Sequence, residues 1–149
     1  KTSSSEIVAY WLGKNNAYRS VKTAMEIQNL LKEKFYNEKE NSMIKISCGI
    51  NTDISVFAIL GSKKFSNYAV IGNSYDIAVR LESACVFHDS EILISQKTFE
   101  NIKDRIIATN KGILSITGKQ EPLNFYEPES IINDKMSYLD KLRGDKEND

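Results

Sequence analysis

The sequence predicts an α+β domain in which helices pack on a sheet of mostly antiparallel strands. Short apolar runs typical of strands occur along most of the chain, and longer segments have the three- and four-residue apolar spacing of amphipathic helices. Strands also follow one another without an intervening helix, which is typical of antiparallel neighbours. The expected order is strand, helix, strand, strand, helix, strand, helix, strand, strand.

The size and charge fit one globular domain. The chain has 149 residues, of which 41% are hydrophobic, and its 20 basic residues balance its 20 acidic ones. No overall field therefore favours nucleic acid or an acidic membrane, and a polyanion site has to be local. No apolar run approaches the ~20 residues that span a bilayer, and no signal pattern is present. We expect a cytoplasmic domain, either alone or as the cytosolic part of a larger membrane-anchored protein.

In the N-terminal half, the pattern predicts a strand, a long helix and a hairpin. Residues 6–11 predict a short buried strand, and apolar residues at helical spacing predict an amphipathic helix over residues 17–35. Apolar and polar residues then alternate over residues 44–50, as in a half-buried strand. Residues 51–53 can close a hairpin into the apolar run 54–60, which we expect to be a central strand covered on both faces.

A polar arm and a second helix are predicted next. Residues 61–72 predict the arm and a short strand, and the helix begins at Asn73 or Ser74, because either residue is a good N-cap. The inward stripe of this helix consists of Ile77, Leu81, Ala84 and Cys85. Asp76 and Arg80 lie at the border of the stripe, one turn apart, and this spacing favours an ion pair between them.

The C-terminal part predicts three strands and a short helix. Residues 91–95 predict a strand, and Ser95 caps a short helix over residues 96–102. Two further strands are predicted on either side of a turn at Gly118 and Lys119. A charged tail with a weak helical pattern follows.

The reactive and aromatic side chains have structural interpretations. Cys48 and Cys85 have no CxxC spacing and no His partner, so we expect free core thiols in a reducing compartment. His88 follows the apolar end of a helix, where capping or a surface position is expected. Tyr10 and Trp11 end a predicted buried strand and are expected in the core.

Several segments, taken together and in order, resemble the class III adenylate and guanylate cyclases. "YAVIGNSYDIAVRLES" is similar to that family's Y-T-V-I-G-D-T-V-N-x-A-x-R-L-E, and "ISCGINTDISVFAILGS" is similar to G-I-x-x-G-x-x-x-x-G-x-x-G-S. "EILISQKTFENI" and "SITGKQEPLNFYEP" resemble its last strands. The resemblance implies the family's ferredoxin-like palm over residues 1–128. The first strand would lie upstream of Lys1, and residues 129–149 would form a tail.

The resemblance also implies a reaction and its partners. In this family the sites lie between two head-to-tail protomers, and the ribose 3'-hydroxyl of ATP or GTP attacks the α-phosphate and releases pyrophosphate. Two Mg or Mn ions held by two aspartates activate the attack, while an Asn and an Arg stabilise the transition state. The implied partners are a purine nucleoside triphosphate and a second cyclase domain, in a homodimer or a heterodimer.

Three residues match the functional positions of the family. Arg80 falls on the transition-state arginine, whose planar fork suits phosphate oxygens. Lys119 falls on the lysine that holds the terminal phosphates, although an ordinary turn lysine is the alternative interpretation. Lys1 falls on the base-reading lysine of a segment usually written K-T-x-G-D.

Other positions depart from the family pattern. Asp76 stands where the transition-state asparagine is expected, and an ionised carboxylate can only accept hydrogen bonds. Ser5 replaces the second metal aspartate, so Mg or Mn has no ligand in this chain. Ala69 replaces the partner of the base-reading lysine. Asp53 and Ala58 replace two hairpin glycines, where side chains would close the approach to a nucleotide.

The sequence leaves three functions open and does not distinguish ATP from GTP. The first is a catalytically silent cyclase homology domain that serves regulation or dimerisation. The second is a cyclase that is active once the upstream metal-binding strand or a metal-supplying partner is present. The third is a sensor that binds a purine triphosphate without cyclising it. RNA binding by the sheet has less support, because the seven tyrosines are scattered and not interleaved with basic residues.

Overall fold

The computed structural model describes residues 6–37, 42–43, 45–62, 65–115 and 122–132. The main elements are α1 (Asn16–Lys34), β3 (Cys48–Ile50), β4 (Val56–Ser62), β5 (Phe65–Ile71), α2 (Ser74–Phe87), β6 (Ile92–Ser95), α3 (Gln96–Glu100), β7 (Ile106–Leu114) and β8 (Leu123–Ile131). Two short strands, β1 (Tyr36–Asn37) and β2 (Ser42–Met43), pair with each other after α1. Both long helices are confirmed close to their predicted bounds.

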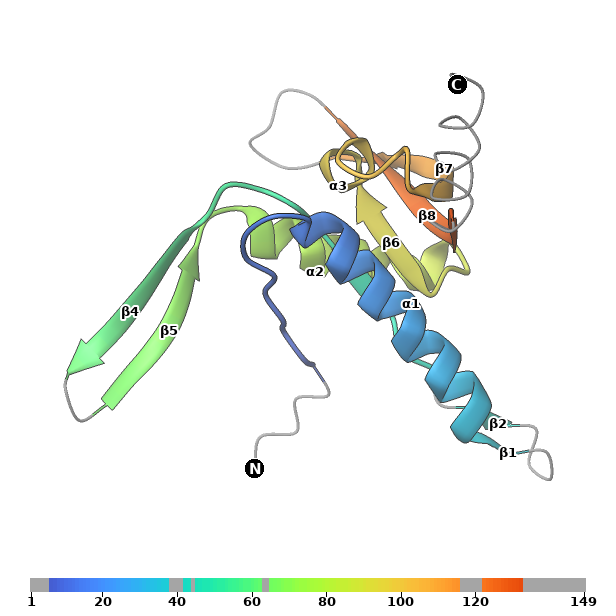
Figure 1. Ribbon diagram of the computed structural model, residues 1–149, viewed down its shortest axis with the longest axis horizontal. Coiled ribbons are helices and arrows are strands. Elements are labelled where there is room, and N and C mark those ends of the chain that lie inside the picture. Colours follow the sequence, from blue (N-terminus) through green and yellow to red (C-terminus); the bar gives the residue numbers. More distant parts are fainter. Residues whose placement is uncertain (1–5, 38–41, 44, 63–64, 116–121, 133–149) are drawn as a thin grey trace, which may run out of the picture.

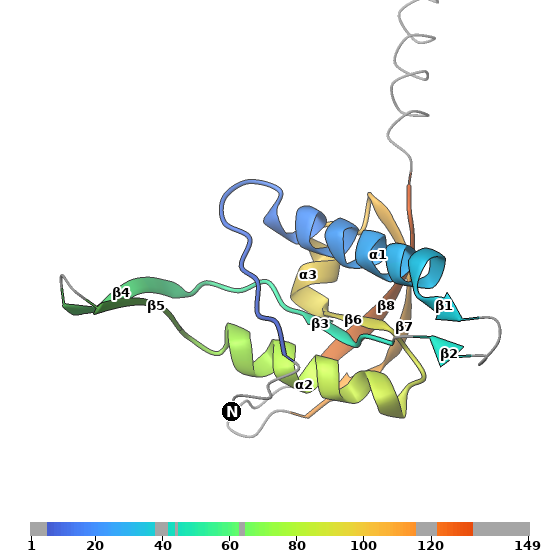
Figure 2. The same cartoon turned by 90° about the horizontal axis from the view of Figure 1, so that it is seen from below.

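The body of the molecule is a four-stranded sheet between two helices. Its strand order is β3-β6-β8-β7, in which β3 runs parallel to β6 and the other neighbours are antiparallel. Figures 1 and 2 show α1 on one side of this sheet and α2 on the other. The predicted α+β class with a mostly antiparallel sheet is confirmed.

Alternate residues of β6 build the cores on the two faces. Ile92 and Ile94 pack with Ala17, Val21 and Ala24 of α1. Between them, Leu93 faces the other way, into a cluster with Ile77, Leu81, Cys85 and Phe125. The predicted inward stripe of α2 is therefore confirmed, with Ala84 half-buried at its edge. This alternation follows from the two-residue period of a strand that is covered on both faces.

Gly49 allows β3 to lie directly against α2. A Cβ at this position would lie 1.9 Å from the carbonyl oxygen of Ala78 and 2.4 Å from the backbone nitrogen of Glu82. Both distances are far shorter than any real contact of a side chain, so only glycine fits. This close packing holds the middle of α2 against the edge strand of the described sheet.

The expected hairpin into a central strand is wrong. Of the expected strand over residues 44–50, residues 45–47 have no regular secondary structure and β3 pairs with β6. β4 pairs antiparallel with β5 from Val56↔Ile71 to Ser62↔Phe65. The β4–β5 pair forms a two-stranded arm that projects from the body (Figure 1). Val56 is 62% exposed there. An apolar run predicts burial but does not identify the partner strand. The partner of β4 is β5, not the strand over residues 44–50.

The buried strand predicted at residues 6–11 is also wrong. These residues have no regular secondary structure, Ile7 is 93% exposed, and Tyr10 is exposed rather than in the core. Trp11 is half-buried. A strand requires a hydrogen-bonded neighbour, and none of the described strands pairs with this segment.

The last strand of the described sheet in chain order is β8. β8 runs to Ile131, so the sheet includes residues beyond 128, while most of the expected tail lies outside the described residues. No helix in the described part of the chain has the length and apolar content to cross a bilayer.

Candidate functional site

The first two turns of α2 carry Asp76 and Arg80, the two residues that align with the family's transition-state positions. Gly72 has a φ of 144°, which turns the chain from β5 into the helix, and Asn73 is the N-cap residue, as predicted. Its side chain makes no capping hydrogen bond. Asp76 lies in the first turn of the helix, where the helix dipole favours negative charge, and Arg80 lies one turn later.

The predicted ion pair between Asp76 and Arg80 is wrong. Both side chains are exposed, and neither has a charged partner among the described residues. An exposed pair of this spacing gains only ~0.3 to 0.5 kcal/mol, which the entropy of two solvated side chains readily offsets. The guanidinium of Arg80 is consequently open to an anion from solvent. The carboxylate of Asp76 is equally open beside it.

The first turn of α2 is tied to the chain that leads into the arm. The hydroxyls of Ser55 and Ser74 lie 2.5 Å apart and share a hydrogen bond. The side-chain amide of Asn51 donates to the carbonyl of Ser74 at 3.3 Å. These contacts join residues 19 and 23 positions apart in sequence, so no local pattern predicts them.

Asp53 is held against α3. The ammonium of Lys97 lies 2.6 Å from its carboxylate, and the backbone N–H of Ile54 donates to the same oxygen at 2.8 Å. The sequence predicts that the Asp53 side chain closes the approach to a nucleotide. In the structure this side chain binds Lys97 of α3. Ala58, the other glycine replacement, lies half-buried in β4 opposite Ala69 of β5.

A buried threonine completes the contact with α3. The hydroxyl of Thr98 is 3.1 Å from that of Thr52, and it donates to the carbonyl of Ile50 at 3.4 Å. The backbone N–H of Thr98 donates to the side chain of Ser95, which confirms Ser95 as the cap of α3. Thr98 is fully buried, so these bonds satisfy groups that water does not reach.

The remaining predicted site residues are only partly placed. Ala69 lies in β5, the strand that leads through Gly72 into α2. Lys1, Ser5 and Lys119 lie outside the described residues. The structure therefore places Asp76 and Arg80 on one helix and Ala69 in the strand that precedes it.

No metal centre is found in the part of the chain that the structure describes, since it holds no group of three or more His, Cys, Asp or Glu side chains arranged around a cation. Magnesium and manganese prefer several oxygen ligands. The hydroxyl of Ser5 is no substitute for a bridging carboxylate. The described residues thus offer no ligand set for the two ions that the family resemblance implies.

The two thiols are free and lie on opposite faces of the sheet. Cys48 packs on the α1 side, and Cys85 packs in the α2 cluster. Burial raises the pKa of Cys85 from 9.0 to about 11, and it also raises the pKa of Cys48. The predicted core position is confirmed for Cys85, while Cys48 is only half-buried. His88 is the C-cap of α2 and packs edge-on against Phe125, as the capping interpretation predicts.

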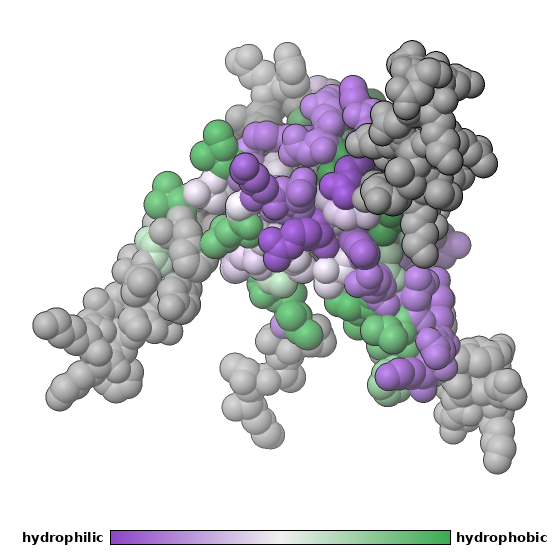
Figure 3. Space-filling view, viewed as in Figure 1, coloured by the Kyte–Doolittle hydropathy of each residue, from purple (hydrophilic) through white to green (hydrophobic). Residues whose placement is uncertain are grey.

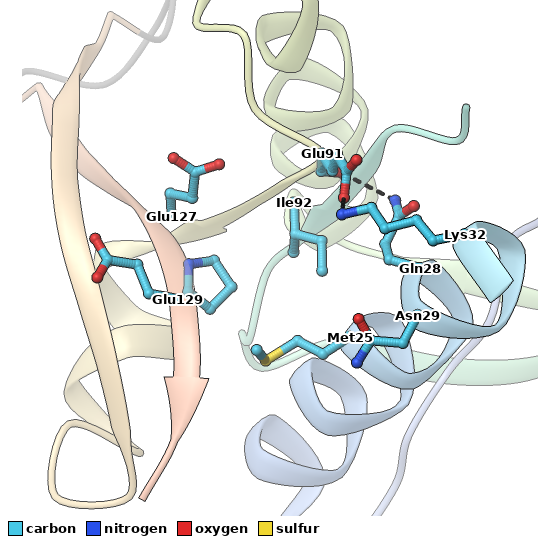
Figure 4. Close-up of a pocket in the computed structure, with 9 residues that line it drawn as sticks. Met25, Gln28, Asn29, Lys32, Glu91, Ile92, Glu127 and Glu129 are labelled. Atoms are coloured by element: carbon cyan, nitrogen blue, oxygen red, sulfur yellow. Dashed lines mark hydrogen bonds and ion pairs between the residues drawn. The ribbon is translucent and has the colours of Figure 1, made fainter. Parts of the chain in front are cut away.

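A small pocket lies away from this helix, between α1, the start of β6 and the end of β8 (Figure 4). Its volume is about 130 Å³. Its three glutamates are already engaged: Glu91 with Lys32 at 2.7 Å, Glu127 with Lys111 at 2.9 Å, and Glu129 with the hydroxyl of Thr109. Gln28, which is buried, donates to the carbonyls of Ile46 and Glu91. The polar groups that line the pocket therefore hold α1 against the sheet rather than point to a ligand.

Known proteins share both the sequence pattern and the fold. The pattern of the family described as "Adenylate and Guanylate cyclase catalytic domain" matches residues 8–127. The Dictyostelium discoideum protein "Adenylate cyclase, terminal-differentiation specific" is 28% identical over 117 residues, which are 76% of this chain and 6% of that protein.

Two solved structures are similar as well. The adenylyl cyclase CyaB from P. aeruginosa is 27% identical with a TM-score of 0.58, over 80% of this chain and 59% of that one. The guanylyl cyclase Cya2 is 25% identical with a TM-score of 0.66, over 81% and 61% of the two chains. This chain thus spans a small part of the curated relative and about three fifths of the solved chains. Since the family pattern covers most of its residues, the chain belongs to the class III adenylate and guanylate cyclase catalytic domain family.

Proposed function

We propose that this chain is a cyclase homology domain that pairs with a second cyclase domain and is catalytically silent by itself. The observation that carries the proposal is a set of large apolar side chains that are exposed along the N-terminal segment and at the base of the arm. They are Ile7, Val8, Tyr10, Leu12, Ile54 and Val56. Figure 3 shows apolar residues where the arm leaves the body. Exposed apolar surface of this kind is typical of a protein–protein interface.

The side chains of α2 support the proposal that the chain is catalytically silent by itself. Arg80 is exposed and open to a phosphate, but the carboxylate of Asp76 beside it would repel a phosphate and offers no donor where the family has an amide. The described residues offer no cluster of carboxylates for Mg or Mn, the ions that would activate the ribose hydroxyl. The domain would then contribute the arginine and the pairing surface and leave metal activation to another protomer.

A second candidate function, an active cyclase, is favoured by the edge of the sheet. β3 has β6 on one side and no described strand on the other, and residues 6–11 have no regular secondary structure. One added strand would complete the sheet there. In the family that strand carries the first metal aspartate, so its addition, or a metal-supplying partner, would restore part of the chemistry. The third candidate, a purine triphosphate sensor, rests only on the open guanidinium of Arg80.

Sedimentation velocity tests the pairing. We expect the wild-type chain to shift from monomer to dimer as its concentration rises to high micromolar, and Val56→Asp to remain a monomer. Ile107→Asp is the matched control, because Ile107 is 54% exposed on β7, away from the arm. A wild type that stays strictly monomeric, or equal loss of pairing in both variants, would contradict the proposed interface.

A further inference from the structure

The direction of the β4–β5 arm depends on two short connections to the body. The incoming connection, residues 51–55, has no regular secondary structure. The outgoing connection passes through Gly72, whose φ of 144° belongs to a backbone region that glycine adopts freely. Such joints permit rotation of the arm unless side chains hold them.

Side chains hold the incoming connection from two sides. On one side, Asp53 binds Lys97 of α3 at 2.6 Å. On the other side, Ser55 shares its hydrogen bond with Ser74 at the start of α2. Thr52 adds a hydroxyl contact to α3. The connection is thus clamped between two helices whose own positions are fixed by the sheet.

The ion pair is the charged contact in this arrangement. The side chain of Asp53 is 25% exposed and that of Lys97 is 54% exposed, so the carboxylate is partly shielded from water and ions. The bond from the backbone of Ile54 fixes its orientation. A partly shielded, oriented carboxylate pairs more strongly than a freely rotating one at the surface.

We propose that Asp53 and Lys97 form a latch that fixes the direction of the β4–β5 arm relative to the four-stranded sheet and loosens as ionic strength rises. The hydroxyl contacts of Thr52 and Ser55 restrict the same connection but carry no charge, and salt affects them little. In a pairing domain, a fixed arm presents one surface to the partner and lowers the entropic cost of association. That consequence rests on the proposed function, whereas the latch is a property of the single chain.

Electron–electron distance measurement between two spin labels tests the latch. One label is attached at Asn67→Cys in β5 and the other at Ile107→Cys in β7, in a Cys48→Ser background that keeps the buried Cys85. Samples are diluted with unlabelled chain, so that the distances report on single molecules whether or not they pair. We expect one narrow distribution for the chain with an intact latch.

Breaking the pair should release the arm. With Lys97→Ala or Asp53→Asn, the population at other distances should rise roughly fivefold, and the double variant should add nothing further. The charge swap Asp53→Lys with Lys97→Asp should restore the narrow distribution only in part, because a lysine at position 53 cannot accept the bond from the backbone of Ile54. High salt should broaden only chains that contain the pair. Lys103→Ala is the control, because Lys103 is an exposed lysine just after α3.

Unchanged distributions in both single variants, or equal broadening in the control, would overturn the latch. Sedimentation of the same variants separates the two proposals. A broad arm in a chain that never pairs would support the latch and remove the proposed function. A narrow distance distribution in every variant of a chain that pairs would support the proposed function and remove the latch.

Discussion

Replacing Gly49 by alanine should destabilise the domain more than any other single-carbon change we identify. The new Cβ would meet the carbonyl oxygen of Ala78 at 1.9 Å and the backbone nitrogen of Glu82 at 2.4 Å. Both are backbone atoms in the middle of α2, so no side-chain rotation relieves the contact. An ordinary contact begins at 3.4 Å, and α2 would therefore have to move by about 1.5 Å.

The cost follows from what this movement separates. α2 packs through Ile77, Leu81 and Cys85 against Leu93 and Phe125, and a shift of the helix opens this cluster. Overpacking alone costs ~1 to 3 kcal/mol, and the lost contacts of the cluster add to it, so we expect about 3 to 5 kcal/mol. That is a large part of the ~5 to 15 kcal/mol that stabilises a typical domain.

Chemical denaturation followed by far-ultraviolet circular dichroism measures this loss. Gly13→Ala is the matched control, because a Cβ there meets nothing within 4 Å and the positive φ of 81° costs only ~1 to 2 kcal/mol. Ala78→Gly in the Gly49→Ala background should not rescue stability, since the contacted atoms belong to the backbone. A loss at Gly49 no larger than that at Gly13, or rescue by the second change, would refute the close packing of β3 on α2.

Three further predictions concern the candidate site and the core. The chain alone, with ATP or GTP and Mg or Mn, should form no cyclic nucleotide, and product above a heat-inactivated control would contradict this. Asp76→Asn should raise the affinity for a non-hydrolysable purine triphosphate because it removes a repelling charge, and Arg80→Ala should lower that affinity because it removes an exposed cation. Calorimetric titrations that show no binding by the wild type or by either variant would remove the sensor function. Stability should fall as the pH rises from 9.0 towards about 11, because the thiol of Cys85 ionises in the unfolded chain before it does in the folded one; a Cys85→Ala variant with the same pH slope would contradict this.

Features set by neighbouring residues could be predicted from the sequence. The stripe at Ile77, Leu81 and Cys85 specifies a face of α2 because helical spacing is local. The cap at Ser95 is equally local. The positions of Asp76 and Arg80 on α2 follow from the same pattern, while their catalytic roles remain predictions.

Features set by distant residues could not be predicted. Lys97 and Asp53 are 44 positions apart, and each by itself looks like an ordinary surface charge. Conversely, the spacing of Asp76 and Arg80 predicts an ion pair that does not form. The spacing permits the contact, but for two exposed side chains the solvation of the charges and the lost side-chain entropy offset its energy. The pairing of β3 with β6 rather than β4 is likewise a property of the folded sheet.

The apolar run at residues 54–60 differs in the structure from what its composition predicts. Its composition predicts a strand covered on both faces, yet the structure places it in an arm, with Ile54 91% and Val56 62% exposed. Keeping such side chains in water costs ~1.5 to 3 kcal/mol each relative to burying them, and an exposed hydrophobic strand also risks aggregation. A second protomer that covers the arm would supply the burial that the composition predicts. The proposed latch between Asp53 and Lys97 would then keep the arm in one direction while that surface is covered.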